Sequence, residues 1–120
     1  MSFPPATLAL LDRTAEVDIE TRSAKGAAHR VPIWVVVDGE DVFVRTYRGD
    51  KSRWYRELRA APGALVAGSK RIGVRAVPAT DRESIRRTSD AYRAKYAKSG
   101  SLNSMLRQAV LDTTLRLEPA

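Results

Sequence analysis

A run of apolar residues followed at once by a turn signal constrains the fold of this sequence more than any other feature. Residues 31–37 (VPIWVVV) are apolar throughout, which predicts a strand that is buried on both faces. Asp38-Gly39 is a turn signal typical of β-hairpins, and residues 42–47 form an alternating partner strand in which Arg45 lies between two aromatic residues. We therefore predict an antiparallel hairpin with its tip at Asp38-Gly39.

Strand patterns recur along the chain, so the predicted fold class is mainly β (α+β). In residues 17–23, Val17, Ile19 and Thr21 alternate with charged residues, which indicates a half-buried strand. The complete pattern predicts six strands, over residues 17–23, 31–37, 42–47, 64–67, 72–78 and 113–117.

One long helix and two or three short ones are expected beside the strands. A capping box that begins at Thr80 predicts the longest helix over about residues 81–98. The spacing of Trp54 and Leu58 predicts a short helix over residues 52–61, with Trp54 in the core. Two further short helices are expected, one after Pro4-Pro5 and one over residues 102–111.

The length of 120 residues is that of one domain, and no internal repeat or linker divides residues 1–120. The sequence contains no cysteine, which excludes disulfides, thiolate metal sites and a cysteine nucleophile. That absence fits a reducing compartment, and the sequence has neither a secretion signal nor a membrane-spanning stretch. We therefore expect a cytoplasmic protein.

Positive charge is concentrated in the middle of the chain. The whole sequence has a net charge of +7, whereas residues 1–44 carry net −3 and residues 45–98 carry net +10. Such a block favours an anionic ligand, such as a phosphorylated cofactor or a nucleic acid. A solvated, arginine-rich surface explains the charge equally well.

Two segments combine cations with a backbone that a ligand can approach. In residues 21–34, Lys25 and Arg30 flank a loop of small residues. In residues 45–58, a turn and a helix start bring cationic and hydroxyl side chains together, and a helix N-terminus attracts anions. The candidates in this second segment are Thr46, Lys51, Ser52 and Arg53. We expect Arg30 and Arg53 to converge on one pocket, because the hairpin folds the chain back between them.

Other common types of site are absent from the sequence. His29 is the only histidine, so a site with several histidines is excluded, and its polar context predicts a surface loop. Neither common Gly-rich phosphate loop is present, and no serine lies in a nucleophile-elbow motif.

Taken in order, these motifs resemble a known superfamily over roughly residues 16–80. In the first segment Lys25, Gly26, Arg30 and Pro32 match its basic Gly loop and the strand that follows. In the helix, the matching residues are Trp54, Tyr55, Leu58, Ala60, Ala61 and Pro62. The sequence is similar to the flavin- and deazaflavin-binding split β-barrels (pyridoxamine 5′-phosphate oxidase-like), and most similar to their deazaflavin-dependent nitroreductase-like branch.

The resemblance implies a six-stranded antiparallel split β-barrel, a homodimer, and FMN or a deazaflavin coenzyme in a cleft between subunits. It implies an oxidoreductase that transfers hydride between the cofactor and a small organic substrate. The phosphate or acidic tail would contact Lys25, Arg30, Lys51, Ser52 and Arg53. The ring system would be flanked by Trp34, Arg45, Thr46 and Tyr47. No residue stands out as a catalytic acid or base, and no metal ligands are predicted.

Two other functions remain open from the sequence. A module that binds nucleic acid or another polyanion would also explain the basic block, although aromatic residues make up only 7% of the chain. A haem-binding relative on the same fold would need an axial ligand, and His29 is the sole imidazole candidate.

Overall fold

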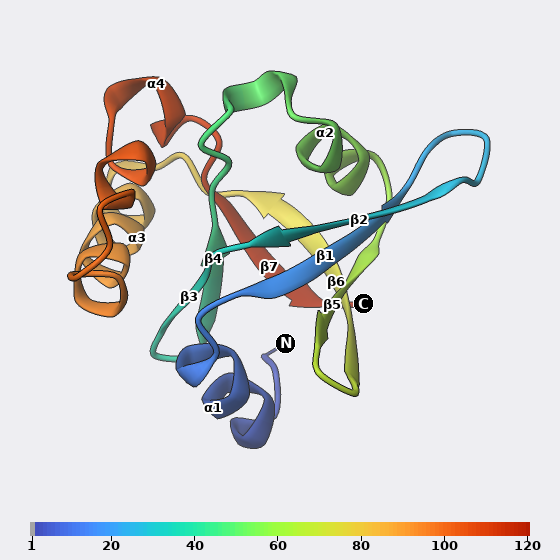
Figure 1. Cartoon of the computed structure of the whole chain (residues 1–120), viewed down its shortest axis with the longest axis horizontal. Coiled ribbons are helices and arrows are strands. Elements are labelled where there is room, and N and C mark those ends of the chain that lie inside the picture. Colours follow the sequence, from blue (N-terminus) through green and yellow to red (C-terminus); the bar gives the residue numbers. More distant parts are fainter. Residues whose placement is uncertain (1) are drawn as a thin grey trace.

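A computed structural model describes residues 2–120. Seven strands form one antiparallel sheet in the order β2-β1-β5-β6-β7-β4-β3 (Figure 1). The strands are β1 (Val17–Arg22), β2 (Ala28–Ile33), β3 (Val35–Asp38), β4 (Asp41–Val44), β5 (Gly63–Ala67), β6 (Lys70–Pro78) and β7 (Leu115–Pro119). The helices are α1 (Pro5–Arg13), α2 (Arg53–Ala60), α3 (Arg82–Lys95) and α4 (Gln108–Leu111), with 3₁₀ turns η1 (Gly49–Lys51) and η2 (Leu102–Met105).

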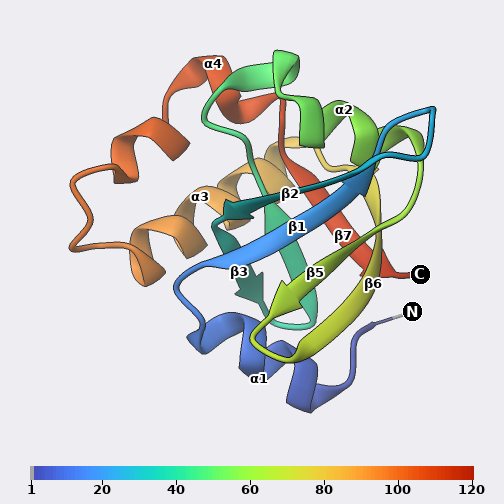
Figure 2. The same cartoon turned by 45° about the vertical axis from the view of Figure 1, so that its right-hand side comes forward.

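The prediction of six strands is wrong because residues 31–37 do not form one strand. The chain breaks at Trp34, where it leaves one edge of the sheet for the other. Before the break, β2 pairs with β1, and Ile33 lies opposite Val17. After it, β3 pairs with β4, and Val35 lies opposite Val44. One residue thus connects the two edge strands of the sheet. The sheet curls into a half-barrel, and its two edges approach each other at Trp34 (Figure 2).

The interior of the half-barrel is the main apolar core. Alternate residues of β1 point into it, and Val17 and Ile19 are almost fully buried, as the alternation predicted. Leu11 of α1 and Leu58 of α2 cover this interior from outside the sheet. A second, smaller cluster lies on the other face of β3 and β4, against α3 and η2. Its buried members are Val36, Phe43, Ala79, Tyr92, Tyr96 and Met105.

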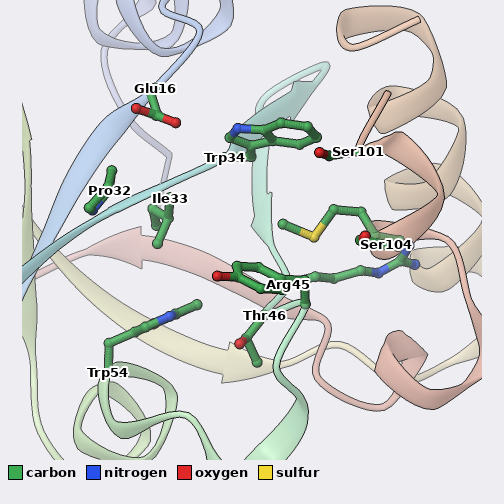
Figure 3. A pocket seen from close by; sticks show the side chains of 11 residues that line it. Glu16, Pro32, Ile33, Trp34, Arg45, Thr46, Trp54, Ser101 and Ser104 are labelled. Carbon is green, nitrogen blue, oxygen red and sulfur yellow. Dashed lines mark hydrogen bonds between the residues drawn. The ribbon is translucent and has the colours of Figure 1, made fainter. Parts of the chain in front are cut away.

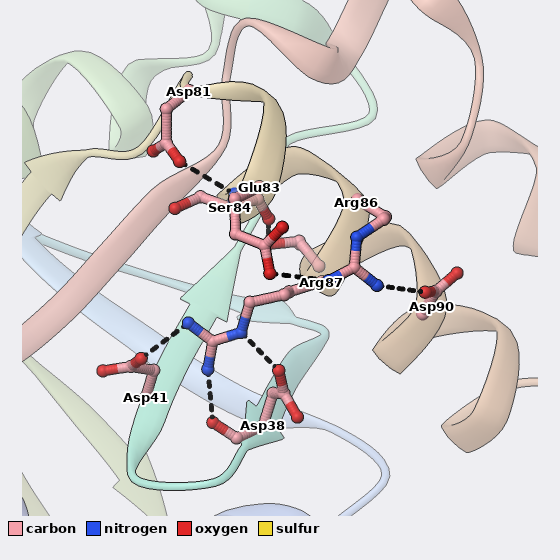
Figure 4. A network of polar contacts seen from close by, with 9 residues as sticks. Asp38, Asp41, Asp81, Glu83, Ser84, Arg86, Arg87 and Asp90 are labelled. Atoms are coloured by element: carbon pink, nitrogen blue, oxygen red, sulfur yellow. Dashed lines mark hydrogen bonds and ion pairs between the residues drawn. The ribbon is translucent and has the colours of Figure 1, made fainter.

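The hairpin at Asp38-Gly39 is confirmed. Asp38 pairs with Asp41, so the loop has two residues, and Gly39 takes the positive φ of +63° that suits the first position of such a turn. Arg87 of α3 fastens this tip, since its guanidinium contacts Asp38 Oδ2 at 2.5 Å and Asp41 Oδ2 at 2.9 Å (Figure 4). The adjoining cluster of helix charges in the same view is held together by contacts within α3.

The longest helix does not begin as predicted. Asp81, not Thr80, is the N-cap of α3, because its carboxylate accepts a hydrogen bond from the Ser84 amide at 3.0 Å. The helix ends at Lys95. The single helix predicted over residues 102–111 is instead divided into η2 and α4. Among residues 2–120, no helix combines the length and apolar character needed to cross a membrane.

Candidate functional site

Two adjoining cavities lie between the split edge of the sheet, η1 and the start of α2. They share four lining residues, so they form one continuous groove. The first, here called the aromatic cavity, has a volume of about 400 Å³ and is lined by Glu16, Pro32, Ile33, Trp34, Arg45, Thr46, Tyr47, Trp54, Ser101, Ser104 and Met105 (Figure 3). The second, here called the cationic cavity, has a volume of about 560 Å³ and is lined by His29, Val31, Pro32, Thr46, Tyr47, Arg48, Lys51, Ser52, Arg53 and Trp54.

Trp34 forms a fixed wall of the aromatic cavity. Its indole stacks on the ring of Tyr96, with centroids 4.1 Å apart and an angle of 5° between the planes. The Tyr96 hydroxyl donates to the carbonyl of Ala15 at 2.6 Å, which holds that ring in turn. The Tyr92 hydroxyl donates to the Trp34 carbonyl at 2.8 Å. The carbonyl at the break in the sheet is therefore satisfied by a side chain of α3.

Arg45 lines the cavity, but its guanidinium extends away from it toward η2 and α3 (Figure 3). The residue is fully buried, and burial lowers its pKa to about 10. Its N–H groups donate to neutral acceptors, which are Thr114 Oγ1 (2.8 Å), Ser89 Oγ (2.9 Å) and the carbonyls of Met105 (3.0 Å) and Ile85 (2.9 Å). The structure thus places this cation behind the cavity, where it connects α3 and η2 to the sheet.

The cationic cavity gathers three of the predicted tail-binding residues. Lys51 and Arg53 are exposed at its surface, and Arg48 adds a third positive charge. Ser52 is only 8% exposed and occupies the N-cap position of α2, yet its hydroxyl makes no capping hydrogen bond. The cavity is thus lined by three cations and by Ser52 at the N-terminus of α2, which is an arrangement suited to an anion.

The structure corrects the prediction that His29 lies in a surface loop. His29 is in β2, its side chain is 24% exposed, and its Nδ1 lies 3.0 Å from Glu57 Oε1. Thr21 Oγ1 donates to the same carboxylate oxygen at 2.8 Å. Burial opposes ionisation of Glu57, but the hydrogen bonds from His29 and Thr21 outweigh it and lower the pKa of the carboxyl. His29 is therefore a half-buried wall of the cationic cavity, held by a carboxylate on α2.

Two predicted tail-binding residues lie outside the groove. Lys25 is exposed in the turn between β1 and β2, and Arg30 forms an ion pair with Asp18 at 3.4 Å. Arg30 directly follows His29 in β2, so its side chain points to the opposite face of the strand. The expected convergence of Arg30 and Arg53 on one pocket is therefore wrong, because Arg53 lines the cationic cavity and Arg30 does not.

Sequence reasoning also misjudged which face of α2 enters the core. The buried residues of α2 are Tyr55 and Leu58, whereas Trp54 is half-buried and lines both cavities. Glu57 was missed altogether as a site residue. Its spacing from Arg53, one turn of helix, was the only available signal that both residues share a face.

Much of the basic block is neutralised by acidic partners. Arg71 forms a bidentate pair with Glu20, and Arg87 bridges Asp38 and Asp41. Arg86 and Arg93 both pair with Asp90 within α3. The cations that line the cationic cavity, Arg48, Lys51 and Arg53, are not among these pairs.

Known structures share this architecture over nearly the whole chain. A crystal structure of Campylobacter jejuni ChuZ matches with a TM-score of 0.70 and 14% identity, covering 95% of this chain and 50% of ChuZ. HutZ, the heme storage protein from Vibrio cholerae, matches with a TM-score of 0.64 and 15% identity, covering all of this chain and 92% of HutZ. An F420 reductase matches with a TM-score of 0.53 and 19% identity, covering 98% of this chain and 96% of the reductase.

The fold is that of a split β-barrel, which is the architecture that the sequence motifs predicted. The chain spans half the length of ChuZ, the first of these structures. More particularly, the chain belongs to DUF2255, a family described as uncharacterized proteins conserved in bacteria, whose model matches residues 7–117. No curated protein matches the sequence.

Proposed function

We propose that this protein binds a flavin or deazaflavin coenzyme in the groove and acts as an oxidoreductase on a small organic substrate. One observation carries the proposal: a cavity lined by aromatic side chains opens directly into a cavity lined by cations. Trp54 and Tyr47 line both. A cofactor with a planar ring and a phosphate or acidic tail has the same two-part chemistry.

The dimensions and lining fit such a ligand. Both volumes lie within the range of roughly 300–1,000 Å³ that small-molecule sites occupy. The ring would lie against Trp34, Tyr47 and Trp54, and the tail would meet Lys51, Ser52 and Arg53. The F420 reductase that shares the fold supports a deazaflavin as one of the candidate cofactors.

The protein's part in the reaction is to bind, orient and shield. A bound flavin or deazaflavin supplies the hydride-transfer chemistry itself. Trp34 is fixed by its stack on Tyr96, so that wall is preorganised before a ligand arrives. Apolar side chains such as Ile33 and Met105 line the same cavity and exclude water from the ring.

Spectroscopic titration with FMN, riboflavin and a deazaflavin coenzyme tests the proposal. Arg53→Ala is expected to weaken binding of the phosphorylated cofactor by about 1.5–3 kcal/mol, the scale of a hydrogen bond to a charged group. Arg56→Ala is the matched control, because Arg56 is exposed on the same helix but does not line the groove. Failure of all three compounds to bind would refute the proposal. Salt-sensitive binding of DNA in their place would favour a polyanion-binding module.

Haem binding is a second candidate function, and one observation favours it. A metal-bound imidazole commonly gives its other ring N–H to a carboxylate, and Glu57 holds His29 Nδ1 in that manner. HutZ, which shares the fold, is described as a heme storage protein. If haem is the ligand, adding it should produce an absorption band that shifts in His29→Ala. An identical band in that variant would exclude His29 as the ligand.

A further inference from the structure

We propose that the groove takes an organic cation as its substrate, and that the carboxylate of Glu16 recognises the positive charge beside the indole of Trp34. This inference rests on the proposed function, which gives the cationic cavity to the tail of the cofactor and leaves the end of the groove at Glu16 for the substrate. It adds a residue that neither the sequence motifs nor the family resemblance assigned to the site.

The groove carries charges of opposite sign at its two ends. Glu16 and Trp34 line the aromatic cavity alone, whereas Arg48, Lys51 and Arg53 line the cationic cavity alone. The four residues that line both cavities are uncharged. Charges arranged in this way favour an anionic group at one end of the groove and a cationic group at the other.

The backbone at Glu16 is anchored on both sides, although the side chain is exposed. The carbonyl of Ala15 accepts the hydrogen bond from the Tyr96 hydroxyl, and Val17, where β1 begins, is buried in the core. Burial and, after it, the negative charge of Glu16 raise the pKa of that hydroxyl. Because Tyr96 stacks on Trp34, the carboxylate lies close to the aromatic wall, and Figure 3 shows both residues on the same side of the cavity.

The carboxylate of Glu16 is available to a ligand. Within residues 2–120, no lysine, arginine or histidine forms an ion pair with it. The other charged residue of the aromatic cavity, Arg45, is fully buried, and its guanidinium donates to four acceptors on the side of η2 and α3. A ligand in the cavity can therefore contact the carboxylate but not that guanidinium.

The indole of Trp34 supplies the second half of a cation site. Tyr96 covers one face of the indole, so a ligand in the cavity meets the other face. The face of an indole attracts cations more strongly than that of any other aromatic side chain. Apolar residues of the cavity, Ile33 and Met105, suit the hydrocarbon part of the ligand. Together these groups select an organic cation, such as an amine or a quaternary ammonium compound.

Three probes of similar size and different charge test the inference. At neutral pH, benzylamine is a cation, benzyl alcohol is uncharged and benzoate is an anion. The chain has two tryptophans, so ¹H–¹⁵N spectra contain two indole signals, which Trp54→Phe assigns. We expect benzylamine to shift the Trp34 signal and to bind more tightly than benzyl alcohol. Benzoate should leave the Trp34 signal unchanged, and a shift of that signal by benzoate as large as that by benzylamine would overturn the charge selection.

Glu16→Gln tests the role of the carboxylate. The amide keeps the size of the side chain but loses its charge, so the affinity for benzylamine should fall about two- to fivefold, the range for an exposed ion pair. The affinity for benzyl alcohol should not change. Glu40→Gln is the matched control, because Glu40 is an exposed acid at the hairpin tip and does not line the groove. An equal loss in both variants would show that benzylamine responds only to net charge, which would overturn the inference.

The outcomes separate this inference from the proposed function. If benzylamine binds through Glu16 but no flavin or deazaflavin binds, the cation site stands and the cofactor proposal fails. If a cofactor binds but benzylamine binds no better than benzyl alcohol, the cation site is wrong and the cofactor proposal stands. In protein loaded with the cofactor, benzylamine should bind beside it. Competition between the two would overturn the assignment of the cation as substrate.

Discussion

The indole of Trp34 lies parallel to the phenol ring of Tyr96, with ring centroids 4.1 Å apart. Trp34 is the one residue between the two edge strands of the sheet, and Tyr96 is the C-cap residue that directly follows α3. The stack therefore fastens the opening of the half-barrel to its longest helix. Trp34 therefore has two roles, because it lines the aromatic cavity and its stack also contributes to the free energy of unfolding.

Trp34→Leu should consequently lower the free energy of unfolding by about 2 kcal/mol, through lost stacking and lost apolar contact. Trp54 lines the same cavity, but its ring meets Tyr55 edge-on, with ring centroids 6.3 Å apart, and does not stack. Trp54→Leu is therefore the comparison. Its effect should be smaller. Urea unfolding of the two variants provides the comparison, and equal losses would show that the stack adds nothing specific.

The cap of α3 gives a second prediction. Asp81→Ala should lower the melting temperature by several degrees, because the Ser84 amide loses its acceptor. Thr80→Ala changes the adjacent exposed residue and should leave the melting temperature unchanged. Thermal unfolding followed by circular dichroism decides between them. A larger loss in the Thr80 variant would show that the helix begins elsewhere.

Arg45 should tolerate no conservative replacement. In Arg45→Lys the charge remains, but an ammonium group cannot reach the four acceptors that the guanidinium fork satisfies. We expect a loss of about 2–4 kcal/mol in the free energy of unfolding, since buried acceptors remain unpaired. Arg75→Lys, at an exposed position of β6, is the control and should have no effect. Unchanged stability in the Arg45 variant would mean that one positive charge suffices there.

Lys95 should make stability depend on pH. Its Nζ donates to the carbonyls of Leu11 (2.8 Å) and Val35 (2.6 Å), and burial lowers its pKa to about 8. In the unfolded chain a lysine titrates at about 10.4. Between this pH and the lower pKa of the folded state, the unfolded chain therefore binds more protons than the folded protein. The stability of the wild type relative to Lys95→Met should therefore rise between these two pH values, by roughly 1–3 kcal/mol. Chemical unfolding of both proteins at several pH values tests this. A difference in the free energy of unfolding that does not change with pH would contradict it.

The homodimer that the family resemblance implies stays a prediction. The apolar strand at the split does not by itself require a partner, because Val36 is fully buried against α3 and Trp34 is half-buried on Tyr96. Tyr47 is the large hydrophobic residue that remains exposed, at 50%, and it lies on the groove. Sedimentation at micromolar concentration should show a dimer, and a monomer would contradict this prediction.

Local patterns were enough to predict most strands, since alternation and turn chemistry act over a few residues. The hairpin at Asp38-Gly39 and the buried face of β1 are correct for that reason. The break at Trp34 was not predictable from the same signals. An apolar run has no polar residue to mark where its partner changes, and the change depends on which strands lie at the two edges.

The site was predictable only in part, for a related reason. Lys51, Ser52 and Arg53 are consecutive, so local sequence already places them together. His29 lines the same cavity and pairs with Glu57, and that arrangement depends on how β2 packs against α2. Arg45 shows the opposite error, because a cation between aromatics suggested a ligand site and the structure satisfies it with hydroxyls and carbonyls.

The position of β7 has a consequence for how this chain can be made. Residues 115–119 are the last strand in sequence, yet they lie inside the sheet, between β6 and β4. Leu115 pairs with Val44 on one side and with Pro78 on the other. Before β7 is in place, the β3–β4 hairpin has no hydrogen-bonded connection to the remaining strands. During vectorial synthesis on the ribosome, the two parts of the sheet must therefore wait for residues 115–119 to emerge, and the barrel closes only after translation of this region is complete.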